Sequence, residues 1–249
     1  MSPRSDLALI ELASASDVGR TRSDNQDRDL LAPPLIAVAD GMGGHLGGGT
    51  AAAMAVDALR GVGGAGDPTM LLAALEQANR TIARAASDDP GLAGMGTTAT
   101  AALLEGGILY LVHVGDSRAY LIREGRMIQV TDDHSVVAEM VRRGALSADA
   151  ADSHPARHVI TRALGVDADL QIDALRVDLE PGDVVLLCTD GLSGPVADND
   201  ILATVESAAT LEEAAASLVD RANAAGGPDN VTVVLARVDA VTREAAATG

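Results

Sequence analysis

Four aspartates stand at the ends of apolar runs in this sequence. Asp40 follows Leu-Ile-Ala-Val-Ala, Asp116 follows Leu-Val-His-Val-Gly, Asp190 follows Val-Val-Leu-Leu-Cys-Thr, and Asp229 precedes Val-Thr-Val-Val-Leu. A single aspartate in such a place usually belongs to a turn. Four of them, two followed directly by glycine, indicate more than turns. If the strand ends converge, their charges repel one another unless protons or cations neutralise them.

The donor chemistry of this set favours a hard cation. Carboxylates offer only oxygen, which suits Mg²⁺ or Mn²⁺, and the sequence has no cysteine or histidine cluster that would favour zinc. Gly41 follows Asp40, and a residue without a Cβ lets its carbonyl approach an ion closely. The spacing is equally compatible with a simple turn glycine at position 41.

Composition restricts the class of protein. The 249 residues are 47% hydrophobic and 22% charged, enough for one sizeable core. We expect one domain over residues 1–240 and a short tail over 241–249. With 18 Lys+Arg against 36 Asp+Glu, the net charge of -18 argues against nucleic-acid and membrane-surface partners, because both are polyanions.

Cysteine usage and hydropathy point to a location inside the cell. Cys188 is the only cysteine, so an internal disulfide is impossible and a reducing compartment is favoured. No stretch reaches about 18 uninterrupted apolar residues, and acidic residues interrupt the N-terminal region. We therefore expect a cytoplasmic protein without a membrane span.

The elements that must position the aspartates follow from periodicity and breakers. Strands are expected at 9–18, 35–39, 97–104, 107–115, 118–123, 127–130, 171–179, 183–189 and 231–238, and helices at 49–59, 69–86, 135–143, 198–207 and 211–225. Tight glycine-containing connections make 97–130 a meander of antiparallel neighbours. The polar stretch that follows predicts a flap at about 144–165. This order of elements predicts an α+β layered sandwich.

Seven segments, in order, resemble the type 2C metal-dependent protein phosphatases, the PPM family, in its bacterial stand-alone form. The resemblance extends from residue 16 to about residue 238. The segments are 19–27, 38–45, 96–98, 114–120, 154–165, 188–192 and 227–232. It implies a four-layer α-β-β-α sandwich, with two central antiparallel sheets flanked by helices and a metal site at one edge between the sheets.

The resemblance also implies an activity. The chain would be a Mg²⁺- or Mn²⁺-dependent serine/threonine phosphatase that hydrolyses phosphomonoesters on phosphorylated proteins, opposing bacterial serine/threonine kinases. The nucleophile would be a hydroxide that bridges two metal ions and attacks phosphorus directly. We expect phosphoproteins as partners and a monomeric state.

Metal ligands carry over from the matching motifs. Asp40 would bridge two core ions, with the carbonyl of Gly41 on one and with Asp190 and Asp229 on the other. Asp116 together with Asp190 would hold a weaker third ion.

Three further residues receive roles by the same resemblance. Asp27 would act through a bound water, and Asn230 would orient Asp229. Arg22 stands five residues before Asp27, the family's spacing for the arginine that binds phosphate. Its planar fork can hold two phosphate oxygens at once. Its neighbour Arg20 is expected on the solvated surface.

The sequence departs from the animal-type pattern at the general acid. Met42 occupies the position of a histidine that follows the Asp-Gly pair, and the nearest histidine is His45. The proton donor is therefore left open: a metal-bound water could serve, and His45 in its glycine-rich loop could equally cap or pack instead of catalysing. We expect His113 to be a core residue and His134 to start a helix. A place for His158 near the third ion is a further possibility.

Competing chemistries are testable from spacing. A cysteine-dependent phosphatase needs arginine six positions after its cysteine, but Gly194 stands six after Cys188, which excludes that class. The glycine-rich run 41–49 has no adjacent lysine, which weakens a nucleotide-binding role. An inactive or weakly active relative that binds phosphoproteins as a regulatory module is the alternative, and the complete ligand set favours the enzyme.

Overall fold

The computed structural model describes residues 7–240 except 44–46, 64–66, 152–153 and 168. Its strands are β1 Leu7–Asp17, β2 Arg28–Ala32, β3 Leu35–Ala39, β4 Gly41–Met42, β5 Gly96–Thr97, β6 Ala99–Glu105, β7 Ile108–Val114, β8 Arg118–Arg123, β9 Arg126–Gln129, β10 Asp173–Asp178, β11 Val184–Cys188 and β12 Val231–Ala240. Its helices are α1 Gly47–Gly63, α2 Thr69–Asp88, the 3-10 turn Pro90–Leu92, α3 Val136–Arg142, α4 Ala148–Ala151, α5 Asp190–Ser193, α6 Asp198–Ser207 and α7 Leu211–Ala224.

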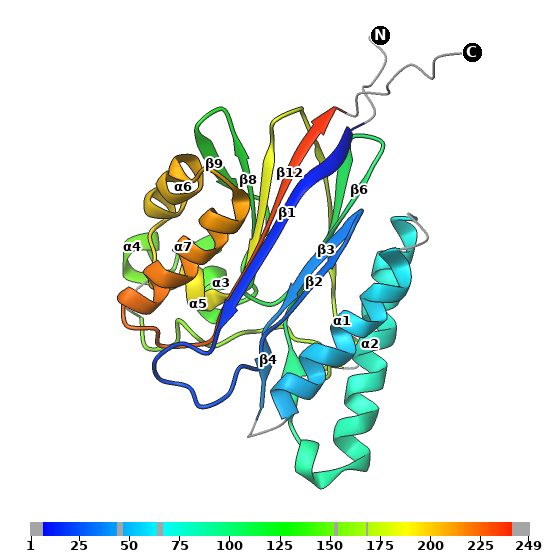
Figure 1. The fold of residues 1–249 in the computed structure, drawn as a ribbon. Coiled ribbons are helices and arrows are strands. Elements are labelled where there is room, and N and C mark those ends of the chain that lie inside the picture. The colour runs from blue at the N-terminus through cyan, green and yellow to red at the C-terminus, as the bar shows by residue number, and fades with distance from the viewer. Residues whose placement is uncertain (1–6, 44–46, 64–66, 152–153, 168, 241–249) are drawn as a thin grey trace, which may run out of the picture.

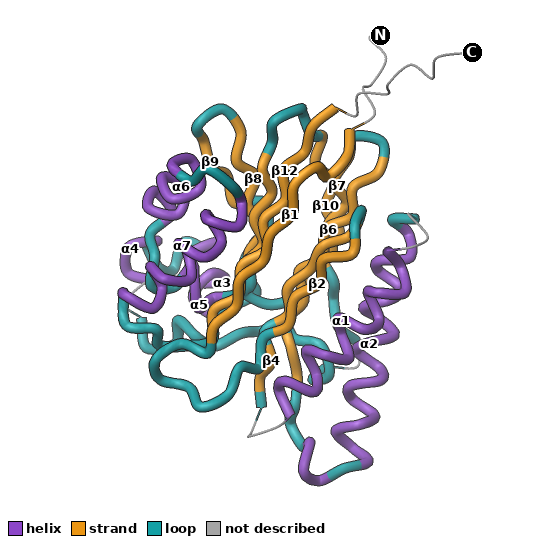
Figure 2. Tube along the Cα trace, in the orientation of Figure 1, coloured by secondary structure: helices purple, strands orange, loops and turns teal. Residues whose placement is uncertain are grey.

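Two antiparallel five-stranded sheets lie face to face in the middle of the molecule (Figure 2). The first sheet has the order β1-β12-β11-β8-β9, and the second has the order β10-β7-β6-β3-β2. Helices α6 and α7 cover the first sheet, and α1 and α2 cover the second (Figure 1). The α+β fold with four layers is therefore as expected.

Three apolar cores separate these layers, and strand alternation explains them. In β3, Leu35 and Ala37 pack towards α1 and α2, whereas Ile36 and Val38 pack between the sheets. In β11, Leu186 faces α6 and α7, whereas its neighbours in sequence face the second sheet. Because both faces are buried, these strands read as continuous apolar runs instead of an alternating pattern.

One expectation about the sheets is wrong. The segments 97–130 do not form one meander, because β7 belongs to the second sheet and β8 to the first. The chain crosses between the sheets at residues 115–117, where Gly115 has a φ of 109°. Each hairpin, β6–β7 and β8–β9, pairs antiparallel as predicted. A tight connection therefore does not ensure pairing when both flanking strands have two apolar faces.

Other elements agree closely with the predictions or were not predicted. Strands β3 and β8 and helix α6 have the predicted bounds. The edge strand β2 and the short pair β4–β5 were missed, because their few residues show no clear periodicity. The described residues of 144–165 are irregular apart from the one-turn helix α4. Within the described ranges, no helix is long and apolar enough to cross a bilayer.

Candidate metal centre

The ends of strands from both sheets meet at the edge where α5 and β4 lie (Figure 1). Asp40 follows β3 of the second sheet, and Asp116 lies in the crossover between the sheets. Asp190 begins α5 just after β11, and Asp229 stands just before β12. Asp27 directly precedes β2. All the strand-end aspartates singled out in the sequence therefore gather at one edge.

Asp40 is the electrostatic centre of this acidic cluster. Burial raises the pKa of Asp40 well above its usual value, and the charges of Asp27, Asp190, Asp116 and Asp229 raise it further. Such an effect requires the carboxylates to lie near one another. The convergence expected from the sequence is therefore present.

The other members of the cluster are perturbed in the same direction. Burial, as the largest cause, raises the pKa of Asp27 to about 7 and that of Asp116 to about 7. Burial and the charge of Asp229 also raise the pKa of Asp190. The ionised form of these carboxyl groups is therefore disfavoured unless cations bind beside them.

The donor set fits divalent cations. The buried oxygens Asp27 Oδ1 and Asp190 Oδ1 have no hydrogen-bond partner, although buried polar atoms normally have one. Oxygen donors of this kind suit Mg²⁺ or Mn²⁺. Among the described residues, no group of three or more histidine, cysteine, aspartate or glutamate side chains is arranged to hold a metal ion. The fit to divalent cations therefore rests on the type of donor and on the two oxygens without partners.

Two threonines hold the main chain of Asp40 in place. The Asp40 amide donates to Thr98 Oγ1 at 2.9 Å, and the Asp40 carbonyl accepts from Thr97 Oγ1 at 2.8 Å. Thr98 Oγ1 also contacts the buried Ser117 Oγ, within the sheet crossover, at 2.8 Å. A hydroxyl chain therefore links the segments that carry Asp40 and Asp116.

Asp27 is anchored by the first sheet. The Thr189 hydroxyl donates to Asp27 Oδ2 at 2.9 Å and accepts from the Thr232 amide at 3.0 Å. Thr189 directly precedes Asp190, so one residue connects two carboxylates of the cluster. Sequence reasoning gave Thr189 and Thr232 no role, although a polar residue within a buried strand was an available signal.

Asn230 fixes the loop that precedes β2 and contacts Asp229 only through its main chain. Its Oδ1 accepts from the Gln26 amide at 2.8 Å, and its Nδ2 donates to the carbonyls of Val18 and Asp24 at 2.9 Å each. The Asn230 amide donates to Asp229 Oδ1 at 2.8 Å. The Asn230 side chain therefore positions the loop that carries Asp27 and Arg22.

Gly41 has a packing reason to be glycine. A Cβ at Gly41 would collide with the main chain of Gly48 in α1 and with the carbonyl of Gln26. Its pairing partner in β5 is Thr97. The small residue thus lets three main-chain segments meet beside Asp40.

Arg22 reaches the acidic cluster, whereas Arg20 does not. Arg22 Nη2 donates to Asp229 Oδ2 at 2.6 Å. Arg20 is 59% exposed and lies 3.7 Å from Asp17, outside the cluster. The surface position expected for Arg20 agrees with the structure.

Comparison with known proteins decides the family. The family model for protein phosphatase 2C matches residues 14–235 of this chain. The chain belongs to the protein phosphatase 2C family. The recognition made from seven short segments is therefore confirmed, together with the family's enzyme class, serine/threonine protein phosphatase.

Bacterial members are similar over almost the whole chain. The serine/threonine protein phosphatase PstP of Mycobacterium tuberculosis is 41% identical over 92% of this chain and 45% of its own length. The serine/threonine phosphatase stp of Listeria innocua is 37% identical, over 88% of this chain and 92% of its own. The solved catalytic domain of PstP in complex with two manganese ions has a TM-score of 0.87, with 39% identity over 94% of this chain and 99% of that domain. The chain thus spans about half the length of the first of these relatives.

The histidines of this phosphatase domain have different surroundings. His113 is fully buried and contacts Thr100 Oγ1 at 2.9 Å and the Asp132 carbonyl at 3.1 Å, as a core residue should. The expectation that His134 starts a helix is wrong, because the Ser135 hydroxyl caps α3 and His134 is buried beside Gly115. His158 Nδ1 lies 3.9 Å from Asp190 Oδ2, and His45 lies outside the described residues.

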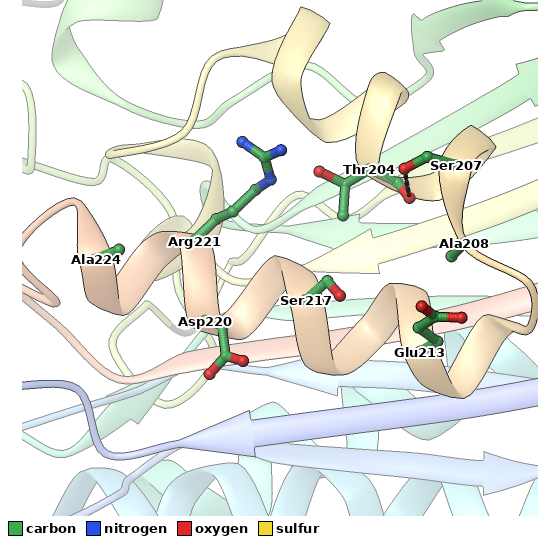
Figure 3. A pocket seen from close by; sticks show the side chains of 8 residues that line it. All are labelled: Thr204, Ser207, Ala208, Glu213, Ser217, Asp220, Arg221 and Ala224. Carbon is green, nitrogen blue, oxygen red and sulfur yellow. Dashed lines mark hydrogen bonds between the residues drawn. The ribbon is translucent and has the colours of Figure 1, made fainter.

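A groove lies between α6 and α7 of the domain (Figure 3). This groove has a volume of about 440 Å³ and is lined by residues such as Thr204, Ser207, Glu213, Ser217 and Arg221. None of the clustered aspartates lines it. The groove is therefore separate from the acidic cluster.

Proposed function

We propose that this chain hydrolyses phosphoserine and phosphothreonine monoesters on proteins at the acidic edge between its sheets. The observation that carries the proposal is the convergence of four carboxylates on Asp40, with two buried carboxylate oxygens left without partners. Its relatives include proteins called serine/threonine phosphatases and a manganese-bound catalytic domain. This donor set makes divalent cations the fitting cofactor.

Asp40 would bridge two core ions, assisted by the Gly41 carbonyl, Asp190 and Asp229, and Asp116 would help to hold a weaker third. Bound ions supply Lewis-acid activation of water and neutralise charge on the phosphoryl group. The protein's part is to fix the ligands. Hydroxyl and amide contacts from Thr98 hold the main chain of Asp40 rigidly.

Arg22 would bind the phosphoryl oxygens of the substrate. Its guanidinium is 56% exposed and already lies at the cluster, on Asp229. A planar fork can hold two oxygens at once and stabilise the charge that builds up on them during transfer. Asp27, whose hydroxyl partner is Thr189, would orient water at the cluster through its unpartnered oxygen.

The wider role follows from the family. We propose that phosphorylated proteins are the partners and that the chain opposes serine/threonine kinases in the cytoplasm, as a monomer with one phosphatase domain over residues 1–240. The stretch 144–165 would act as a flap beside the site, since His158 within it lies near Asp190.

Turnover of a phosphothreonine peptide and of p-nitrophenyl phosphate tests the proposal. Activity should require Mn²⁺ or Mg²⁺ and should disappear with EDTA. Asp40→Ala and Asp190→Ala should lose nearly all turnover at saturating Mn²⁺, whereas Asp116→Ala should act mainly on the weakest ion. Full turnover after exhaustive chelation would contradict the proposal. Phosphopeptide binding without any turnover would favour a regulatory module instead.

A further inference from the structure

His134 forms two hydrogen bonds with the main chain of Gly115. Its amide donates to the Gly115 carbonyl at 2.8 Å, and its Nδ1 accepts from the Gly115 amide at 3.1 Å. Gly115 forms the crossover between the sheets and directly precedes Asp116. A Cβ at Gly115 would collide with Thr98, so this turn has little freedom to move. One buried histidine thus holds the turn that presents Asp116.

The partners of the ring define its tautomer. Because Nδ1 accepts from the Gly115 amide, the neutral ring carries its proton on Nε2. Nε2 lies 3.2 Å from Asp173 Oδ2 and 3.1 Å from Arg162 Nη1, and only the carboxylate can accept its proton, since a guanidinium nitrogen only donates. The other oxygen, Asp173 Oδ1, accepts from Arg162 Nη1 at 3.0 Å. Burial and the nearby charge of Arg162 lower the pKa of His134, although Asp173 acts in the opposite direction. Arg142 also lowers it, which favours the neutral form of the ring.

Arg162 belongs to a segment, residues 159–165, that is hydrogen-bonded to both parts of the site. At one end, the Thr161 amide donates to the His134 carbonyl at 2.7 Å. At the other end, Leu164 and Thr97 exchange two main-chain hydrogen bonds, and Thr97 Oγ1 donates to the Asp40 carbonyl. The return from the flap therefore joins the Asp116 turn to the Asp40 strand end.

We propose that His134 is a positioning residue for the Gly115–Asp116 turn, held in one tautomer by Asp173, and that Arg162 connects this arrangement to the flap. It rests on the proposed function only in treating Asp116 as a metal ligand. Neither His134 nor Asp173 touches the reacting groups. Their effect passes through the Gly115 main chain.

Asp173→Asn separates positioning from mere structure. Asparagine has one oxygen that accepts and one amide group that donates. Its amide group must therefore face another donor, either the Nε2–H of His134 or the guanidinium of Arg162. If its amide group faces Nε2, the ring proton moves to Nδ1 and opposes the Gly115 amide. The double variant Asp173→Asn with Arg162→Met removes the second donor and frees the asparagine oxygen to accept from Nε2. Asp178→Asn, an exposed change at the far end of β10, is the matched control.

Three readouts apply: hydrogen exchange of the Gly115 amide and ¹⁵N shifts of the His134 ring, both on metal-free protein, and Mn²⁺ calorimetry. Asp173→Asn should accelerate Gly115 exchange about tenfold or more, remove the Nε2–H signature, and weaken the weakest Mn²⁺ step about tenfold. Tighter steps should stay within about twofold, and the double variant should recover most of the exchange protection.

Exchange in Asp173→Asn equal to that in Asp178→Asn, or no recovery in the double variant, would overturn the inference. Two of the readouts need neither metal nor substrate. If phosphopeptide turnover is absent while the Gly115 amide exchanges as expected, the result therefore counts against the proposed function alone. Normal turnover with unchanged Gly115 exchange would count against the positioning role alone.

Discussion

Arg22 forms an ion pair with Asp229 in this structure. The strength of this pair affects how readily Arg22 could bind phosphate. An exposed ion pair of this kind contributes only about 0 to 1 kcal/mol. A dianionic phosphate beside cations offers a stronger partner for the same guanidinium. Replacing the Asp229 contact by a contact with the substrate phosphate would therefore cost little free energy, and the ion pair holds the Arg22 side chain at the acidic cluster.

Arg22→Lys tests this assignment, because lysine keeps the charge and loses the fork. We expect kcat/KM for a phosphothreonine peptide at saturating Mn²⁺ to fall by about 1 to 3 kcal/mol in transition-state terms. Mn²⁺ affinity, measured by calorimetry, should hardly change. Arg20→Lys is the matched control at an exposed neighbour and should leave both values alone. Equal losses in the two variants would place the phosphate contact elsewhere.

His113 gives a pH dependence of stability whose sign follows from its pKa. Burial, together with the charge of His134, lowers this pKa to about 4, although the Asp132 carbonyl and the charges of Asp133 and Asp173 act to raise it. Above about pH 6.5 the ring is neutral in both folded and unfolded protein. Between about 6.5 and 4 only the unfolded chain binds the proton, so stability is lost as the pH falls.

His113→Gln should remove this part of the acid sensitivity. The free energy of unfolding, from urea titrations between pH 7 and about 4, should fall less steeply in the variant, with a difference of about 2 to 4 kcal/mol at the acid end. Parallel curves for the two proteins would show that His113 does not titrate as its burial requires.

Residues whose role is set by the local sequence could be predicted. An aspartate at the end of an apolar run is visible as such, and Asp40, Asp116, Asp190 and Asp229 all reached the cluster. The role of Thr189 was not visible, because it depends on Asp27, a residue 162 positions away in the chain. His134 was assigned to a helix start for the same reason, since its partner Asp173 lies 39 positions on.

At the scale of elements, α2 anchors the segment that returns from the flap. Asn79 is buried in this helix, where its Nδ2 donates to the Asp167 carbonyl at 2.8 Å and its Oδ1 accepts from the Gly165 amide at 2.7 Å. Gly165 has a φ of 88°, and a Cβ there would collide with Ile82 of the same helix. One side chain thus fixes a turn that follows residue 164, the partner of Thr97.

Asn79→Ala should loosen this anchor without unfolding the domain. The variant loses two hydrogen bonds, and one of the main-chain groups left without a partner is partly buried. We therefore expect a loss of about 1 to 3 kcal/mol in stability, mainly against local unfolding. We expect faster hydrogen exchange at Gly165 and faster proteolysis within 144–165. Gln77→Ala, an exposed change on the same helix, is the control. Unchanged exchange at Gly165 would mean that the apolar contacts alone hold the turn.

Elements with long periodic or continuous apolar patterns were predicted well, but their pairing was not. The bounds of β8 could be read from its residues, whereas its partner residues in β11 lie 62 to 70 positions away and leave no local mark. The crossover at Gly115 could be recognised as a turn. That it changes sheets depends on the two-sided burial of β7 and β8, which becomes visible only in the assembled sandwich.

At the scale of the molecule, the acidic cluster draws on both sheets and on distant parts of the chain. Its members lie at positions 27, 40, 116, 190 and 229. An unfolded chain cannot hold these carboxylates together, so an ion that binds them binds the folded state alone. Metal binding and folding stability are then linked by mass action.

Mn²⁺ should therefore raise the melting temperature. At about 100 times its dissociation constant the gain is about 2.7 kcal/mol. For a chain of this size that corresponds to a shift of about 5 to 10 °C in a thermal melt. Asp40→Asn should show little shift and, because a repelled charge is gone, should melt above the wild type in EDTA. A variant that melts lower than wild type in EDTA would contradict the repulsion inferred for the cluster.

The pairing of β1 with β12 has a consequence for how the protein is made. Asp17 lies opposite Val231 and Leu7 opposite Ala240, so the first described strand completes its ladder only with the last (Figure 1). A ribosome delivers the chain from the N-terminus, and β1 must wait through synthesis of more than two hundred residues for its partner. Asp229 emerges just ahead of β12. A nascent chain therefore cannot complete its first sheet, or bring its acidic cluster fully together, until β12 has been synthesised.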